Sequence, residues 1–137
     1  SKEIMKWLSL HEFGEAVIMV QKEFFEKLTA SPGNADYSVV SVFSQYCFDI
    51  DPLFDVDKNS FLPPPKIESK VIRLKRRRNK MNKEIIAGLE FLFSYRNKNA
   101  ASLLNTKLYQ NKKIDQLDVE TLVKICNELI ESKQFRK

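Results

Sequence analysis

Three consecutive prolines, Pro63, Pro64 and Pro65, constrain the backbone of this chain more than any other feature. Each proline fixes φ and lacks an N–H group, so we expect the segment to be stiff and extended. Phe61 stands just before these prolines. An aromatic ring held on a stiff segment loses little entropy when another ring stacks on it, so Phe61 is a candidate platform for a nucleic-acid base.

A strongly basic stretch follows the prolines. Residues 70–80 contain seven Lys or Arg side chains and no acid. Residues 1–69 carry a net charge of −5 and residues 70–137 a net charge of +10, so the overall charge of +5 hides a sharp asymmetry. This asymmetry predicts a domain boundary near residue 75 and contact between the second half and an anionic polymer. The alternative is that the basic run is a solvated linker.

The first half has the pattern of a mixed α/β fold. Residues 15–21 are an apolar run with polar flanks, typical of a strand buried on both faces of a parallel sheet. Residues 22–30 read as a helix, ended by a Ser-Pro-Gly-Asn turn. Residues 48–56 and 67–74 alternate in polarity and predict two strands in a wide hairpin, in which Pro52 indicates an edge or a bulge.

Helical spacing accounts for the remaining elements. A short amphipathic helix is expected before Gly14, and Ser38 is a candidate cap for a helix that ends between Gln45 and Cys47. Apolar residues recur with helical period over 85–93 and 100–104, and Asp118 is a candidate cap for a last helix. The predicted fold class is therefore α/β plus all-α, with residues 1–75 and 76–137 as the two domains.

Several kinds of chemistry find no support in the residues. The three glycines are isolated, so no cofactor-binding loop is expected. His11 is the only histidine, so no catalytic group that needs a second histidine can be formed. Cys47 and Cys126 are expected to be buried, reduced thiols. The acids at 49, 51, 55 and 57 are explained more simply as the solvent-exposed face of a strand than as a metal site. No metal site and no membrane span are expected, and the expected location is the cytoplasm.

An ordered series of motifs resembles the small-subunit ribosomal RNA adenine dimethyltransferases. The series comprises Met19–Phe24, Ala30–Gly33, Tyr37–Val42 with Gln45, Val56, Phe61–Ser69 and Val71, and then Phe93–Lys98. The likeness covers the chain from about residue 4 and is most specific over 19–75. Erythromycin-resistance rRNA methyltransferases and mitochondrial transcription factors B share parts of it.

The resemblance implies a fold, and it also implies that part of the family's fold is missing from this chain. Members of the family begin with a glycine-rich S-adenosylmethionine loop and carry an Asn-Leu-Pro-Tyr motif, and neither stands in this chain. The chain therefore resembles the C-terminal half of such an enzyme, with about three strands of a Rossmann-like methyltransferase sheet followed by a small helical domain. These strands would be the family's strands 5, 7 and 6, and the unpaired edge of strand 5 predicts self-association. Alone, the chain is expected to be inactive.

The resemblance also assigns roles. Phe61 would stack on the target adenine as the catalytic contact, and Pro63, Pro64 and Pro65 would form the structural loop that carries it. The expected contacts to small-subunit rRNA, within a pre-30S-type particle, come from nine cations: Lys66, Lys70, Arg73, Lys75, Arg76, Arg77, Arg78, Arg96 and Lys98. The implied cofactor is S-adenosylmethionine. Three alternatives remain: an RNA-binding ribosome-assembly module without catalysis, an erythromycin-resistance-type rRNA methyltransferase, and a protein-interaction domain.

Overall fold

A computed structural model describes residues 1–60, 62–64 and 67–135, with side chains up to residue 132. The described helices are α1 (Lys2–Leu10), α2 (Lys22–Leu28), α3 (Val39–Cys47), α4 (Lys83–Phe93), α5 (Ala100–Leu104) and α6 (Val119–Phe135). The described strands are β1 (Glu15–Gln21), β2 (Phe48–Val56) and β3 (Ser69–Arg76). Two short 3-10 turns lie at Lys58–Ser60 and Ile114–Gln116.

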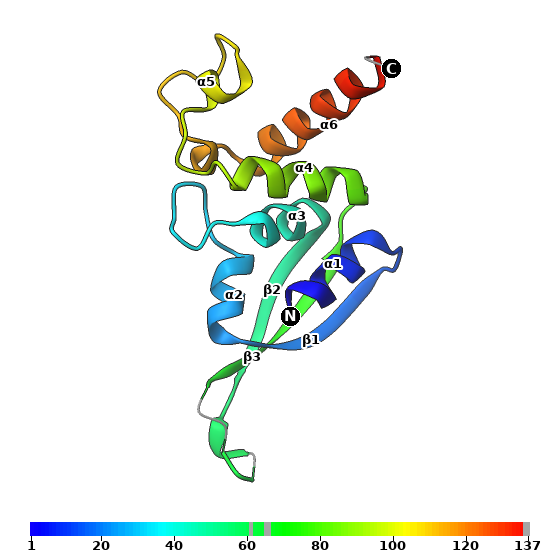
Figure 1. The fold of residues 1–137 in the computed structure, drawn as a ribbon. Coiled ribbons are helices and arrows are strands. Elements are labelled where there is room, and N and C mark those ends of the chain that lie inside the picture. The colour runs from blue at the N-terminus through cyan, green and yellow to red at the C-terminus, as the bar shows by residue number, and fades with distance from the viewer. Residues whose placement is uncertain (61, 65–66, 136–137) are drawn as a thin grey trace.

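The sheet has the strand order β1-β3-β2, and β3 runs antiparallel to both neighbours. This is a three-stranded sheet of the predicted size, in the order expected for the family's strands 5, 7 and 6. The register shifts between Pro52 and Phe54 in β2, an edge strand, so Pro52 lies where proline is tolerated. The hairpin of β2 and β3 extends away from the helices, at the opposite end of the molecule from α5 and α6 (Figure 1).

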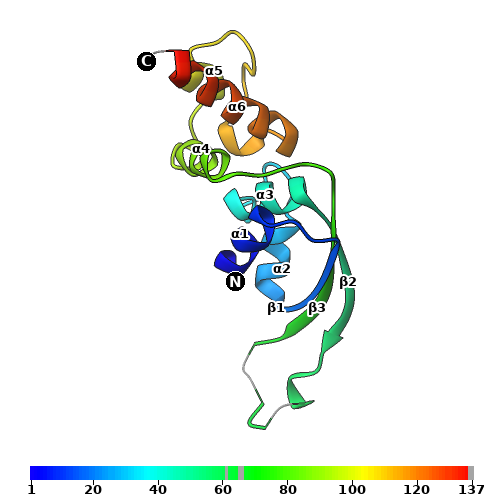
Figure 2. The same cartoon turned by 90° about the vertical axis from the view of Figure 1, so that its right-hand side faces the viewer.

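Helices α1, α2 and α3 cover one face of the sheet, as the edge-on view shows (Figure 2). Ile72 and Leu74 of β3 point into that side and are fully buried. The prediction that residues 15–21 are buried on both faces is wrong. Val17 and Met19 are 59% and 55% exposed, because no described helix covers the other face of the sheet.

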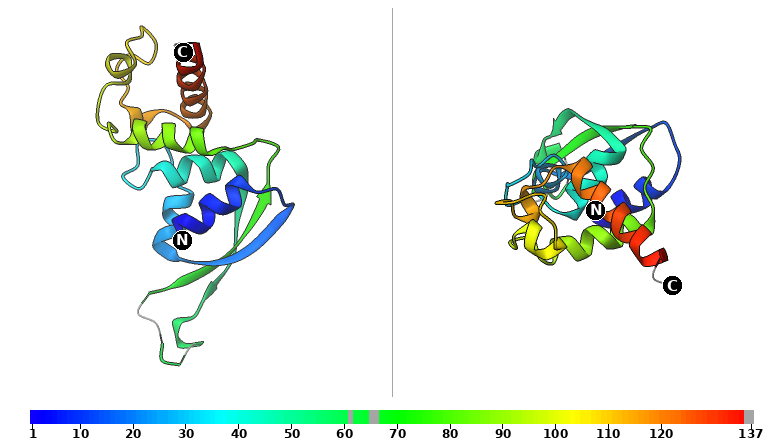
Figure 3. Two further views of the ribbon diagram at one scale, coloured as in Figure 1. Left: turned by 45° about the vertical axis from the view of Figure 1, so that its right-hand side comes forward. Right: turned by 90° about the horizontal axis from the view of Figure 1, so that it is seen from above.

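A single hydrophobic core joins the sheet to the C-terminal helices, and α4 packs on both α3 and α6 (Figure 3). Tyr37 is fully buried and donates a hydrogen bond from its hydroxyl to the carbonyl oxygen of Leu117, at 2.9 Å. Gly33, with φ of 87°, donates from its N–H to the carbonyl oxygen of Asp115 at 2.8 Å. These contacts link residues on either side of the predicted boundary at residue 75, which itself stays a prediction.

Local signals in the sequence account for the helix ends. Ser38 precedes α3, and its N–H donates to Ser41 Oγ at 3.0 Å. Asp118 caps α6, since its Oδ1 accepts from the Thr121 N–H at 2.8 Å. Both expected caps are confirmed. None of the helices within the described residues is long and apolar enough to cross a membrane.

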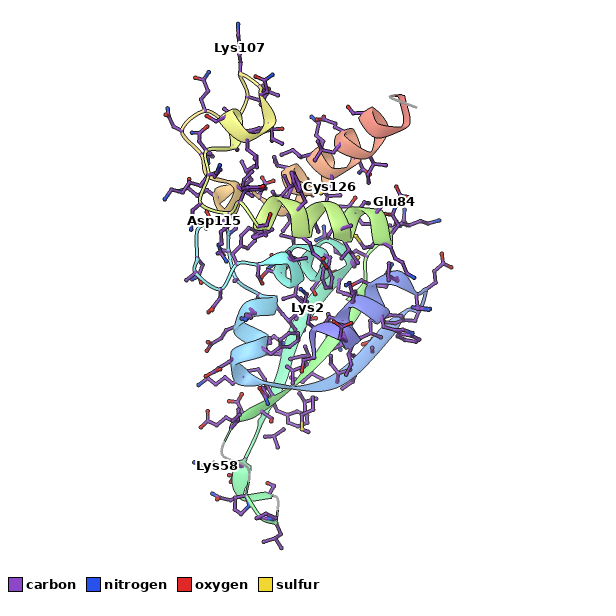
Figure 4. All side chains as sticks on the ribbon, viewed as in Figure 1. Lys2, Lys58, Glu84, Lys107, Asp115 and Cys126 are labelled. Atoms are coloured by element: carbon purple, nitrogen blue, oxygen red, sulfur yellow. The ribbon has the colours of Figure 1, made fainter. Side chains whose placement is uncertain are left out.

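The Cys126 side chain lies where α4 and α6 meet (Figure 4). A Cβ added at Gly88 of α4 would stand 3.0 Å from Cys126 Sγ, so the absence of a side chain at residue 88 lets the two helices approach. Cys126 and Cys47 are both buried and unpaired, as expected. Burial raises the pKa of the Cys126 thiol to about 12, so this thiol stays protonated and unreactive at neutral pH.

Asp118→Ala is expected to lower the free energy of unfolding by about 1 kcal/mol, because the first N–H groups of α6 lose their acceptor. Hydrogen bonds from Thr121 hold the pKa of Asp118 below its usual value. The contribution of its charge is therefore complete above the unfolded pKa of about 3.9 and is lost as the pH falls through the lower folded pKa. Urea unfolding at several pH values measures both effects. Asp118→Asn, which keeps the acceptor, is the control; a stability loss as large as that of alanine would contradict the capping role.

Candidate nucleic-acid interface

The carboxyl end of β1 and the base of the β2–β3 hairpin meet at one place. The backbone N–H of Lys22 donates to the carbonyl oxygen of Glu68 at 3.0 Å, and Lys22 Nζ lies 3.6 Å from Glu68 Oε2. A hollow of about 270 Å³ lies here, lined by Lys22, Asp55, Val56, Asp57, Lys58, Glu68 and Ser69. β1 and β2 both end beside this hollow, and the antiparallel strand β3 begins there.

The expected base-stacking loop continues from this hollow. Asp57 begins it with a local turn, in which its Oδ1 accepts from the Asn59 N–H at 2.9 Å and its carbonyl oxygen accepts from the Ser60 N–H at 2.9 Å. Phe61, Pro65 and Lys66 lie outside the described residues. Leu62, Pro63 and Pro64 are exposed, and the chain bends at Leu62 and Pro63 rather than running straight. The described part of the loop is therefore a solvent-facing turn at the end of the hairpin.

The Lys70 side chain is already engaged and is not available to contact a phosphate. Its Nζ lies 2.6 Å from Asp55 Oδ1, directly across the β2–β3 ladder, and 5.2 Å from the centre of the Phe25 ring. The hydrogen bond and charge of Lys70 hold the pKa of Asp55 below its usual value. Only 19% of the Lys70 side chain is exposed. This arrangement favours a structural role, in which Lys70 ties the two hairpin arms to α2.

Arg73 and Lys75 share the open face of the sheet, as the alternation of β3 requires. Arg73 is held by two acids: its Nε lies 3.3 Å from Glu15 Oε1 and its Nη2 lies 3.5 Å from Asp51 Oδ2. Lys75 is exposed, and among the described residues it makes no hydrogen bond or ion pair through its side chain. Only Lys75 of these two thus offers an unshared charge.

The basic run suggests that Arg76, Arg77 and Arg78 leave the strand and face solvent. For Arg76 the structure differs, because it is the last residue of β3 and its guanidinium donates to the carbonyl oxygens of Leu8 and Ser9 at 3.2 and 3.1 Å. The guanidinium also lies 5.2 Å from the centre of the Phe48 ring. Arg77 is exposed but donates to the carbonyl oxygen of Gln45 at 3.1 Å. The carbonyls at the ends of α1 and α3 therefore engage both guanidinium groups.

Arg96 is a further arginine that is used within the fold. Its Nε lies 3.3 Å from Asp115 Oδ2, and its Nη2 donates to the carbonyl oxygens of Tyr37 and Ala35 at 2.9 and 3.3 Å. These contacts hold the turn before α3 against the segment before α6. The geometry thus gives Arg96 a bracing role in place of the expected phosphate contact, since its donors point inward.

Only some of the nine cations expected to contact RNA remain available for that contact. Arg78 is exposed without a side-chain partner among the described residues, and Lys98 is exposed with Nζ 5.3 Å from the centre of the Tyr95 ring. Lys80 and Lys83 are also exposed and were not singled out from the sequence, although both continue the basic run. Lys75, Arg77, Arg78, Lys80 and Lys83 make up a cationic strip along the chain from the end of β3 to the start of α4. Lys98 follows α4 and is not part of this strip.

Comparison with known proteins agrees with the resemblance in the sequence. The family model described as ribosomal RNA adenine dimethylase matches residues 1–132. The chain belongs to this family. It is 38% identical, over 110 residues, to the ribosomal RNA small subunit methyltransferase A of Mycoplasmopsis pulmonis, a match that covers 77% of the chain and 42% of that relative. The chain spans about half the length of the curated relatives it matches.

Solved structures show the same fold. A dimethyladenosine transferase from Plasmodium falciparum superposes with a TM-score of 0.78 at 22% identity, covering 93% of this chain and 62% of that one. The 23S rRNA methyltransferase ErmE superposes with a TM-score of 0.56 at 22% identity, covering 90% of this chain and 58% of that one. The expected mixed α/β arrangement is thus shared with rRNA methyltransferases, and the likeness is greater to the dimethyladenosine transferase.

Substituting Lys75 or Arg78 with methionine is expected to make RNA binding less salt-dependent. Each phosphate contact that is lost should reduce the slope of log K against log salt by about 0.7–0.9. Lys70→Met is the matched control, since its charge is already paired with Asp55 and its slope should equal that of the unchanged chain. Filter binding to small-subunit rRNA over a range of salt measures all three slopes. If the salt slope falls as much for Lys70→Met as for Lys75→Met, the distinction between paired and unpaired cations is refuted.

Arg96→Met is expected to destabilise the fold by roughly 2 kcal/mol, because three acceptors lose a charged donor. Its effect on the salt slope of RNA binding should be nil. Thermal unfolding measures the first quantity and filter binding the second. Lys98→Met should show the reverse, with unchanged stability and a smaller slope; the prediction fails if the two variants behave alike.

Proposed function

We propose that this chain is part of an S-adenosylmethionine-dependent rRNA adenine N6,N6-dimethyltransferase that acts on small-subunit rRNA during ribosome assembly in the cytoplasm. The observation that carries the proposal is the family match over residues 1–132, which includes the whole Phe61–Ser69 motif. The sheet order and the position of the hairpin at the carboxyl end of β1 support it. In this proposal the three strands are the C-terminal part of a Rossmann-like methyltransferase sheet.

The residues present do not form a site for S-adenosylmethionine. Gly14 lies in the turn between α1 and β1, Gly33 in the turn after α2, and Gly88 within α4 against Cys126. None of the three lies in a loop after a strand, where a glycine-rich segment would let the backbone approach a cofactor. In this proposal, residues outside 1–137 bind the methyl donor. The present chain only holds the RNA and the target base.

Base recognition would centre on Phe61. An adenine must leave its stack before its exocyclic amine can react, which costs a few kcal/mol. Stacking on one aromatic ring returns roughly 1–3 kcal/mol, so a single well-placed ring offsets much of this cost. The paired contacts Lys22–Glu68 and Lys70–Asp55 support the proposal, since they hold both arms of the hairpin that leads to the loop.

RNA binding would use the cationic strip. Small-subunit rRNA, presented in a pre-30S-type particle, offers A-form backbone and 2′-hydroxyl groups that are bound without reading the sequence. Lys75, Arg77, Arg78 and Lys98 remain the proposed contacts of the original set, and Lys66 is retained on the resemblance alone. Sequence-independent contacts of this type make the affinity depend steeply on salt.

The cationic strip also supports a second function, which needs no donor site. By itself the chain could act as an RNA-binding module in ribosome assembly without catalysis. An erythromycin-resistance-type methyltransferase, which would act on large-subunit RNA, has less support. The family match is to ribosomal RNA adenine dimethylases, and the better superposition is on a dimethyladenosine transferase. Binding of small-subunit over large-subunit rRNA fragments, measured at equal salt, would separate the erythromycin-resistance alternative from the other two functions.

Phe61→Ala is expected to abolish most adenine methylation in a protein that joins this chain to a donor-binding half, and to leave rRNA affinity nearly unchanged. The loss of about 1–3 kcal/mol of stacking corresponds to a fall in turnover of roughly 5- to 150-fold. Methyl transfer from labelled donor and filter binding measure the two quantities in parallel. Phe61→Tyr, which keeps the ring, should retain activity. Full turnover of Phe61→Ala would remove the stacking role.

A further inference from the structure

A pair of exposed aromatic rings lies at the carboxyl end of α4, outside the hydrophobic core. α4 buries Ile85, Leu89 and Leu92 on the side that packs on α3 and α6. Phe91, in its last turn, and Tyr95, two residues beyond its end, are instead 50% and 38% exposed. Their ring centres lie 5.5 Å apart, with the rings inclined at 70°. An edge-to-face pair leaves ring faces open, because one ring covers at most one face of the other.

Positive charge adjoins these rings. Lys98 Nζ lies 5.3 Å from the centre of the Tyr95 ring. Residues 91–113 contain five Lys or Arg and no acid, so they form a second basic stretch, separate from residues 70–80. Arg96 is used within the fold. The other four are exposed and make no ion pair through their side chains within the described part of the chain: Lys98, Lys107, Lys112 and Lys113.

The backbone holds Lys98 and Lys113 close together. Asn99 and Lys113 form an antiparallel bridge, and the carbonyl oxygen of Lys98 accepts from the Ile114 N–H at 3.1 Å. The backbones of both lysines and of Tyr95 are therefore positioned before any ligand binds, which reduces the entropy lost on binding.

This surface is separate from the open edge of β1, where the proposed sheet continues beyond residues 1–137. The ion pair between Arg96 and Asp115 fixes the turn after α4 against the segment before α6 (Figure 4). Arg96 also donates to the carbonyl oxygen of Tyr37, just before α3. The exposure of the two rings thus follows from how α4 packs on α3 and α6, not from a strand that lacks its neighbour.

We propose that Phe91 and Tyr95 stack an unpaired base of the bound RNA, and that Lys98 and Lys113 contact the phosphates on either side of it. The inference rests on the proposed function, since it takes the ligand to be rRNA. Stacking of this kind accepts any base, because every base has a π face. The β2–β3 hairpin, which carries the Phe61 loop, lies at the opposite end of the molecule from α5 and α6 (Figure 1). The chain therefore holds RNA at two separate places, and only the hairpin loop takes the target adenine.

The chemistry of this surface matches a nucleotide better than an apolar protein partner. The two rings are a small apolar area, and the exposed residues that follow them, Asn97, Lys98 and Asn99, are polar or basic. An aromatic ring beside unpaired ammonium groups, without an acid, offers a stacking face for a base and a counter-charge for its phosphate. An apolar helix or strand would leave these lysines desolvated and unpaired.

Two RNA hairpins that differ in one base test the proposal. Each has a single bulged nucleotide, which carries adenine in one hairpin and is abasic in the other, so that both have the same phosphates. The 137-residue chain is measured with Phe61→Ala, which removes the other stacking ring. It is expected to bind the adenine hairpin roughly fivefold or more tightly than the abasic one, the fold-change that corresponds to the weaker end of base stacking.

Substitutions at residue 91 assign the preference to the ring. The preference is expected to vanish in Phe91→Ala and in Phe91→Leu, which keeps most of the apolar volume and serves if alanine prevents folding. Phe91→Tyr should keep it. Leu129→Ala is the matched control, since Leu129 is an exposed apolar residue of α6 that follows Glu128, and it should leave the preference unchanged. Lys98→Met and Lys113→Met should each reduce the salt slope by about 0.7 while the preference for adenine remains.

The outcomes separate this inference from the proposed function. If the chain binds neither hairpin, both fail. If it binds both with steep salt dependence but equal affinity, or if the preference persists in Phe91→Leu, only the stacking inference is overturned. The same comparison in a protein that joins this chain to a donor-binding half should give the same preference; its loss there would show that the rings are covered, and would overturn the inference as well.

Discussion

The central strand β3 is the element on which the rest of the structure depends. It pairs with β1 and β2 at once, so it joins two segments that are separated by α2 and α3 in the sequence. Its inward residues Ile72 and Leu74 are fully buried beneath the helices. Its first residues form one arm of the hairpin, and its last residue, Arg76, holds the carboxyl end of α1. Loss of β3 would therefore separate the sheet, the hairpin and α1 together.

The same strand shows why the number of Lys and Arg residues in a sequence overestimates the number that are available to bind a ligand. Lys70, Arg73, Lys75 and Arg76 are consecutive members of one basic run, yet three of them are engaged by acids or carbonyl groups. Asp51 and Asp55 of β2 engage Arg73 and Lys70, and carbonyl oxygens of α1 engage Arg76. Acidic residues 49–57 and basic residues 70–76 lie in facing strands, so the charge asymmetry of the sequence is partly neutralised by pairing across the hairpin. The positive charge that remains unpaired is carried by Lys75 and by the cations beyond the sheet.

Local patterns in the sequence were sufficient for most elements. Proline, glycine and capping residues bound the helices as expected, and the alternation of residues 48–56 and 67–74 predicted the hairpin, although β3 begins at Ser69 and ends at Arg76. The inward use of Arg96 could not be predicted, because its acceptors Ala35 and Tyr37 are about 60 residues away and become neighbours only after folding. The exposure of Val17 was missed for a similar reason: an apolar run shows that a strand can be buried, and the elements around it decide whether it is.

The β2–β3 hairpin and β1 differ in how far their groups are satisfied by neighbouring elements. The β2–β3 hairpin extends from the body with both arms fixed by ion pairs to its neighbours, which suits a loop that must hold one position against a ligand. β1 instead presents backbone groups and apolar side chains that no other described element satisfies. Under the proposed function, this edge is where the rest of a Rossmann-like methyltransferase sheet would continue. The cationic strip is the proposed RNA contact, which would act through charge. Salt screens contacts between charges far more than it weakens strand pairing, so the proposed RNA contact should depend on salt while the integrity of the sheet should not.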